Sequence, residues 1–290
     1  MNSNAESKLQ LAPRLEPDWA LWKAQFLAIF RIEFRKAAFT KRAYPCLTLA
    51  MLPILILAIA AWESLSLNES VFETVENARE IYGQIFSTLM LGGVVFLGTA
   101  SIFTTLLRGE VLDQSIHYYL LAPVRREVIV LAKFIAGLSF AIALFGSMTL
   151  LGFLLLYPPF GMEQLTSDIT NGIVFQQMGQ YLGIIILACM GYGSVFLACS
   201  LLFRNPLIPI VLIVGWETIH FILPPVLKLL SVIHYLKGLL PIPLDEGPLA
   251  VIVAPPPVWV SIVGMTGLTL AMLYASVVLL KEHELRYTDD

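Results

Sequence analysis

The chain has few charged residues and no long polar segment. Only 13% of its 290 residues are charged and 58% are hydrophobic, whereas soluble domains average about 25% charged and about 45–50% apolar residues. The least hydrophobic region is the N-terminal stretch of about 20 residues, which is too short to form a core of its own. The composition therefore argues against an ordinary soluble domain and predicts an all-α integral membrane protein.

Several common signatures are also missing. The three cysteines lie in or beside apolar runs; their odd number argues against a disulfide framework, and their spacing fits no common metal site. No cleavable signal peptide precedes the first apolar run. No Gly-x-x-x-x-Gly-Lys-Ser/Thr motif occurs, so we expect no ATP or Mg²⁺ bound by this chain and no metal or other cofactor.

Six apolar stretches are long enough to cross a bilayer as helices, which takes about 20 residues each. Together they define a transmembrane domain over residues 43–280, with a cytoplasmic tail at 281–290. The predicted spans are residues 43–62, 84–107, 128–157, 176–203, 207–230 and 257–280.

The distribution of basic residues predicts the orientation. With the N-terminus inside, 15 of the 18 Lys and Arg residues lie in cytoplasmic segments, and only Arg79, Lys228 and Lys237 lie outside. Five glutamates fall in the first external loop, between residues 63 and 80. We therefore expect both termini in the cytoplasm.

Residues 1–42 are predicted to form a cytoplasmic tail and an amphipathic helix that lies at the inner membrane interface. The alternative is a soluble helix with one core-facing side. The aromatic and aliphatic residues at helical spacing are Trp19, Trp22, Phe26, Ile29 and Phe30, and the basic residues are Arg31, Arg35, Lys36, Lys41 and Arg42.

The external segment 231–256 is rich in proline and in apolar residues. Proline prevents a continuous helix there. The apolar residues are too many for a solvated loop, so we expect short half-helices that dip into the membrane against protein.

The cytoplasmic loop 108–127 carries the most informative motif. An acidic residue at the end of a span is followed by paired leucines, a Pro-x-x-Arg turn and a lysine seven residues later. These positions are Glu110, Leu120, Leu121, Pro123, Arg126 and Lys133. The loop resembles that of ABC-2 type transporter permeases, although this chain has Gln114-Ser115 where the family often has Gly-Thr.

The resemblance implies the membrane subunit of an ATP-driven exporter, in which a separate P-loop ATP-binding subunit binds ATP and Mg²⁺. It further implies an assembly with a second permease chain, identical or related, and a translocation path between the two. The loop would dock into the ATPase as a short helix. The alternative for its arginines is ordinary membrane anchoring. The proposed coupling residues are Glu110, Asp113, His117, Leu120, Leu121, Pro123, Arg125 and Arg126.

Glu217 and His220 are ionisable residues inside the fifth predicted span. Their i, i+3 spacing places them on one helix face. Intramembrane charges are costly and tend to face a cavity or a partner. Two readings remain open: a polar patch on the translocation path, or a structural pair that ties this helix to a neighbour.

Two other function classes compete with a permease. A proton-coupled secondary transporter usually shows internal repeats and several intramembrane charges, and an intramembrane enzyme needs a catalytic cluster; Glu217 and His220 are the only candidates for either. A non-transporting scaffold is a further alternative. The apolar spans are mildly consistent with a hydrophobic or amphipathic cargo. We expect a multi-pass protein of a bacterial inner membrane, in contact with lipids and not with nucleic acid.

Overall fold

The computed structural model describes residues 19–40, 43–66, 72–112, 124–203, 205, 207–219, 224–241 and 256–288; for 107–112, 225 and 282–288 it describes the backbone but not the side chains. The described part is helical and contains no β-strand. Five of its helical segments are long and apolar enough to cross a membrane. This confirms a multi-pass, all-α membrane protein.

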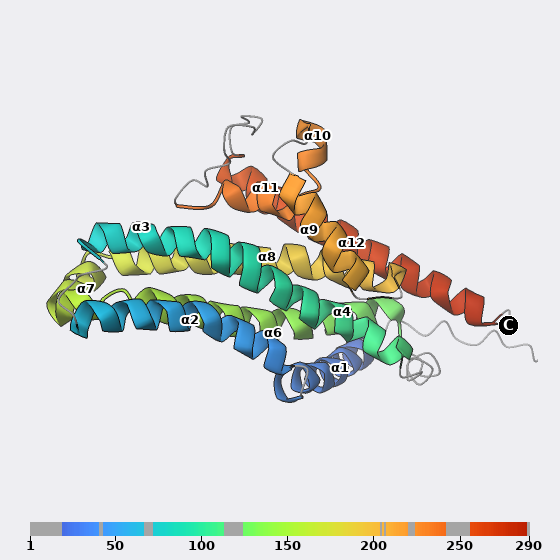
Figure 1. The fold of residues 1–290 in the computed structure, drawn as a ribbon. Helices are drawn as coiled ribbons and strands as arrows, with labels where there is room; N and C mark the ends of the chain where they lie inside the picture. Colours follow the sequence, from blue (N-terminus) through green and yellow to red (C-terminus); the bar gives the residue numbers. More distant parts are fainter. Residues whose placement is uncertain are drawn as a thin grey trace, which may run out of the picture.

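Four long helical columns lie side by side (Figure 1). They are α2 (Ala43–Ser66), the continuous column α3 (Val75–Ile85), η1 (Phe86–Val95) and α4 (Phe96–Leu112), then α6 (Arg126–Leu154) and α8 (Ile173–Leu202). Because apolar residues cover most sides of these helices, they pack into a common core and still present apolar surface outward.

The two ends of this bundle differ. The short helices η2 (Pro158–Phe160) and α7 (Gly161–Thr170) connect α6 to α8 at one end, while α1 (Trp19–Phe39) packs against α6 at the other (Figure 1). At the α7 end, the guanidinium group of Arg79 on α3 pairs with the buried carboxylate of Asp168 and lies 3.4 Å from the Tyr157 hydroxyl. This contact fixes α7 to the second column.

The C-terminal helices lie along one side of the bundle (Figure 1). They are α9 (Leu207–Ile219), α10 (Pro225–Lys228), α11 (Val232–Lys237) and α12 (Val258–Thr288), and α12 packs along α8. Gly191 of α8 permits a close approach of both helices: a Cβ atom built there would lie 2.5 Å from the sulfur of Met265 on α12 and 3.0 Å from a methyl carbon of Val232 on α11.

The second column contains an irregularity that the apolar pattern did not predict. Ten residues, Phe86–Val95, form a π-helix between two α-helical segments. The hydroxyl groups of Ser87 and Thr88 both donate to the Gln84 carbonyl oxygen where this segment starts. A π-helix changes the angular register of the side chains, so α3 and α4 present different faces than one uninterrupted α-helix would.

The expected span over residues 207–230 is not one continuous helix. Helix α9 has 13 residues, about 20 Å of helix, and Pro224 adopts an extended conformation before α10 begins. Proline has no N–H group to donate, and it disfavours a helical conformation in the residue before it. The structure therefore supports five spans and a shorter apolar helix, and the sixth full span is not confirmed.

Where two helices approach closely at a glycine, we expect a larger side chain at that position to lower the stability of the protein. A Cβ atom on Gly193 of α8 would lie 2.6 Å from the ring of Phe103 on α4, whereas one on Gly183 would meet nothing within 4 Å. We expect Gly193→Leu to destabilise the protein by at least about 1–3 kcal/mol through overpacking. Thermal unfolding in detergent measures this, with Gly183→Leu as the control on the same helix. Equal melting temperatures for the two variants would contradict the α4–α8 packing.

Candidate functional site

The proposed coupling residues fall partly outside the described chain. Asp113, His117, Leu120, Leu121 and Pro123 lie outside it. Glu110 lies in the last turns of α4, where only the backbone is described. The structure describes Arg125, which precedes α6, and Arg126, its first residue. The structure therefore describes the two ends of this region, where α4 ends and α6 begins.

Helix α1 packs along the first turns of α6, directly after the loop. The guanidinium carbon of Arg125 lies 4.2 Å from the centre of the Trp22 ring, a distance typical of a cation–π contact. Farther along, Ile29 of α1 and Ile129 and Ala132 of α6 are buried together. The chain therefore re-enters the membrane domain, at the start of α6, in direct contact with α1.

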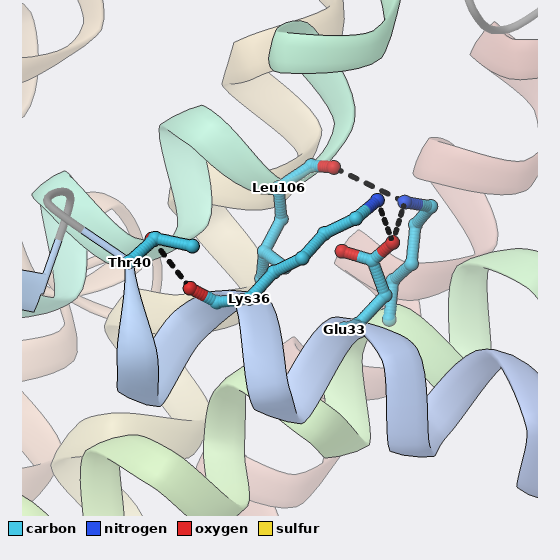
Figure 2. A network of polar contacts seen from close by, with 5 residues as sticks. Glu33, Lys36, Thr40 and Leu106 are labelled. Atoms are coloured by element: carbon cyan, nitrogen blue, oxygen red, sulfur yellow. Dashed lines mark hydrogen bonds and ion pairs between the residues drawn. The ribbon is translucent and has the colours of Figure 1, made fainter.

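A buried polar network closes this contact. Glu33 of α1 and Lys133 of α6 are 3% and 0% exposed, and Lys133 Nζ lies 3.1 Å from Glu33 Oε1. Lys133 also donates to the carbonyl oxygen of Leu106 on α4, at 3.3 Å. Figure 2 shows the carboxyl group of Glu33 receiving a second contact from the amino group of Lys36, at 3.0 Å. One lysine thus joins α1, α4 and α6.

We call this arrangement of Glu33, Lys133 and the Leu106 carbonyl the three-helix junction. Burial alone raises the pKa of Glu33, but the charge of Lys133 and the hydrogen bond and charge of Lys36 lower it by more. Its pKa therefore lies below the ordinary value, and Glu33 is ionised at neutral pH. A buried carboxylate of this kind is stable because it is paired.

The lowered pKa predicts an acid sensitivity with a defined sign. The ionised form of Glu33 contributes stability above the pKa of the unfolded chain, about 4.3, and this contribution is lost as the pH falls through the lower folded-state pKa. We expect the melting temperature of the wild type to fall more steeply below about pH 4.3 than that of Glu33→Gln. Parallel slopes for the two proteins would contradict the pairing.

A second contact reaches the same region from the C-terminal helix. Lys281 of α12 lies 2.7 Å from Glu127, in the first turn of α6. Both side chains are about half exposed, so this ion pair contributes little stability of its own. It nevertheless places the end of α12 beside the start of α6.

Glu217 binds the short helix α11. Its carboxyl oxygens accept hydrogen bonds from the Ser231 hydroxyl at 2.5 Å and the Val232 backbone N–H at 2.9 Å. A third backbone donor, Ile233 N–H, lies at 3.4 Å. His220 lies outside the described residues, so the predicted pair is not tested. Among described groups, Glu217 connects α9 to the start of α11.

Glu33 was not singled out from the sequence, and Lys133 was named as part of the loop motif but not among the coupling residues. Glu33 is an acidic residue in a helix otherwise rich in basic and aromatic residues, and Lys133 follows the loop inside an apolar span. Each residue could have been identified as one partner of an ion pair, because ionisable groups in apolar surroundings tend to be paired. The pairing itself depends on α1 folding back onto α6, which no local pattern specifies.

The described residues contain no group of three or more His, Cys, Asp or Glu side chains that could hold a metal ion. The junction instead combines features suited to mechanical connection: buried, paired charges and packed helices at both ends of one loop. Comparison with protein families found a match to the model described as "ABC-2 family transporter protein" over residues 29–216. No curated protein and no solved structure matches the chain significantly.

Proposed function

The chain belongs to the ABC-2 transporter family, and we propose that it is the permease subunit of an ATP-driven exporter. A separate P-loop ATP-binding subunit supplies the energy and docks at the 108–127 loop. Two permease chains and two ATP-binding subunits form the assembly, with the translocation path between the permeases. The apolar spans favour a hydrophobic or amphipathic cargo.

The observation that carries this proposal is the three-helix junction. Leu106 precedes the loop and Lys133 follows it, and the two residues are hydrogen-bonded to each other. Lys133 is also paired with Glu33 of α1. A force applied to the loop therefore acts on α1, α4 and α6 together.

Close packing makes such a connection effective. Packed interfaces move between discrete arrangements and do not deform continuously. When the ATPase closes or opens around its nucleotide, the docked loop moves, and the junction transmits that displacement to the second and third membrane columns. The Trp22–Arg125 contact keeps the exit of the loop against α1 during this movement.

The geometry gives less support to a function centred on Glu217. Its carboxyl group is occupied by donors of α11 and the preceding serine, and the described residues around it include no second acidic side chain bonded to it. Proton coupling or intramembrane catalysis is the alternative to be tested if no ATPase partner is found.

A photoreactive amino acid in the loop tests the proposal. Placed at Leu120 in the full-length protein in its native membranes, it is expected to crosslink to a protein that carries a P-loop. The same residue at Met162, which is exposed at the opposite end of the bundle, serves as the control and should not. Crosslinks from Leu120 to lipid alone, or to a protein without a P-loop, would contradict docking through this loop.

A further inference from the structure

The second membrane column changes from α-helix to π-helix and back to α-helix. Its π-helical part, η1, occupies Phe86–Val95, and the residues on either side, Ile85 and Phe96, are α-helical. The neighbouring helices α6 and α8 are α-helical throughout their 29 and 30 residues. Sharp bends in helices have few causes, and π-helical turns and glycines are among them. The second column can therefore bend where its two neighbours are regular.

Two adjacent glycines lie in the second half of η1. A Cβ atom built on Gly93 would meet no described atom within 4 Å apart from the nearby backbone of its own helix, and one built on Gly92 would meet only the carbonyl oxygen of Ser87, at 3.6 Å. Close packing against another described helix therefore does not require glycine at either position. Glycine has more accessible backbone conformations than any other residue, so the pair adds flexibility to η1.

Helix α3, on one side of η1, is attached at the α7 end of the bundle. Arg79 pairs with the buried carboxylate of Asp168 on α7. The Tyr82 hydroxyl donates to the carbonyl oxygen of Thr149 on α6 at 2.8 Å, and both residues are buried. The Tyr82 ring also packs edge-on against Tyr181 of α8, with ring centroids 5.1 Å apart. These contacts tie α3 to α6, α7 and α8.

Helix α4, on the other side of η1, is attached at the three-helix junction. Its Leu106 carbonyl oxygen accepts a hydrogen bond from Lys133 of α6. The ring of Phe103 lies so close to α8 that a Cβ atom on Gly193 would be 2.6 Å away. The two α-helical parts of the second column therefore have separate attachments, and η1 lies between them.

We propose that η1 is a hinge in the second column. Helix α4 follows the junction, while α3 stays attached at the α7 end. The uninterrupted helices α6 and α8 tilt as rods. The junction end of the membrane domain can therefore rearrange without breaking the contacts of Arg79 and Tyr82 at the other end. This inference concerns the flexibility of the membrane domain and does not depend on an ATPase partner.

Hydrogen exchange of the full-length protein in lipid nanodiscs, measured by mass spectrometry, tests the flexibility of η1. The matched segment is residues 181–192 of α8, which lie beside η1: the Phe86 and Tyr181 ring centroids are 4.6 Å apart, and those of Phe96 and Tyr192 are 5.1 Å apart. Exchange reports local opening of the backbone, so we expect residues 86–96 to exchange several-fold faster than residues 181–192. Equal exchange in the two segments would overturn the proposal.

Alanine variants test whether the glycine pair supplies this flexibility. Gly92→Ala combined with Gly93→Ala should slow the exchange of η1 several-fold, because alanine has fewer backbone conformations and fits at both positions. The control is Gly179→Ala combined with Gly183→Ala on α8, where added Cβ atoms also find open space; it should leave the exchange of η1 unchanged. Unchanged exchange in the η1 variant would contradict a hinge at this pair.

Releasing the junction distinguishes a hinge from a rigid rod. The Glu33→Leu/Lys133→Leu variant removes the hydrogen bond between Lys133 and the Leu106 carbonyl oxygen. We expect the exchange of α4 to rise several-fold in this variant and that of α3 to stay the same. A similar rise in both helices would show that the column moves as one rod. No rise in α4 would show that the junction does not hold it, and either result would overturn the proposal.

Discussion

Glu33→Leu is expected to destabilise the membrane domain by about 3–5 kcal/mol, the usual cost of removing one partner of a buried ion pair. The reason is that Lys133, which is fully buried, loses the carboxylate 3.1 Å away. By contrast, Lys36 is half exposed and can turn to solvent. Thermal unfolding of the purified protein measures the change, which corresponds to a fall in melting temperature of roughly 10 °C.

A double variant separates pairing from packing. Replacing a buried ion pair by apolar residues is often close to neutral, so Glu33→Leu combined with Lys133→Leu should recover at least half of the lost stability. If the double variant is as unstable as the sum of the two single variants, the two side chains do not interact, and the junction does not join α1 to α6 in the manner described.

Glu217→Leu is expected to cost about 2–4 kcal/mol, because it leaves the Val232 N–H and the Ser231 hydroxyl without their acceptor. These donors lie 2.9 and 2.5 Å from the Glu217 carboxyl oxygens, and both groups are buried. The measurement is again thermal unfolding, combined with protease accessibility of the α10–α11 segment, which should increase.

Thr218→Val provides the matched control. Thr218 is the next residue of α9, it is exposed, and its hydroxyl donates to the Val214 carbonyl of its own helix, so its loss should change stability by less than about 0.5 kcal/mol. If Glu217→Leu is as stable as Thr218→Val, the carboxyl group does not hold α11. If Glu217→Gln impairs transport while stability is kept, the residue acts on the translocation path.

The main features of the fold were predictable because helix length and hydropathy are local properties. The stretches at 43–62, 84–107, 128–157, 176–203 and 257–280 each correspond to a long apolar helical segment. The stretch at 207–230 did not, because average hydropathy does not register the effect of Pro224 on the backbone. The π-helical segment Phe86–Val95 has no local signature either, since its residues would suit an α-helix equally well.

The site was predictable in position and only partly in its contacts. The Pro-x-x-Arg turn and the following Lys133 indicated where the loop enters the membrane domain. The partners of Lys133 come from residues 27 and 100 positions earlier in the chain. Such contacts depend on how whole helices pack. For the same reason, the Gly179-x-x-x-Gly183 spacing is typical of a helix-packing face, yet a Cβ atom built at either glycine would meet no described atom within 4 Å apart from the nearby backbone of its own helix.

Copurification tests the central claim most directly: this chain is the membrane subunit of a transporter powered by another polypeptide. The full-length protein is isolated from its native membranes in a mild detergent, and the accompanying proteins are identified by mass spectrometry. We predict that a P-loop ATPase accompanies the wild type and is lost from the Pro123→Ala/Arg126→Ala variant, which still inserts into the membrane. A chain that purifies alone, or only with copies of itself, in several detergents would contradict this account.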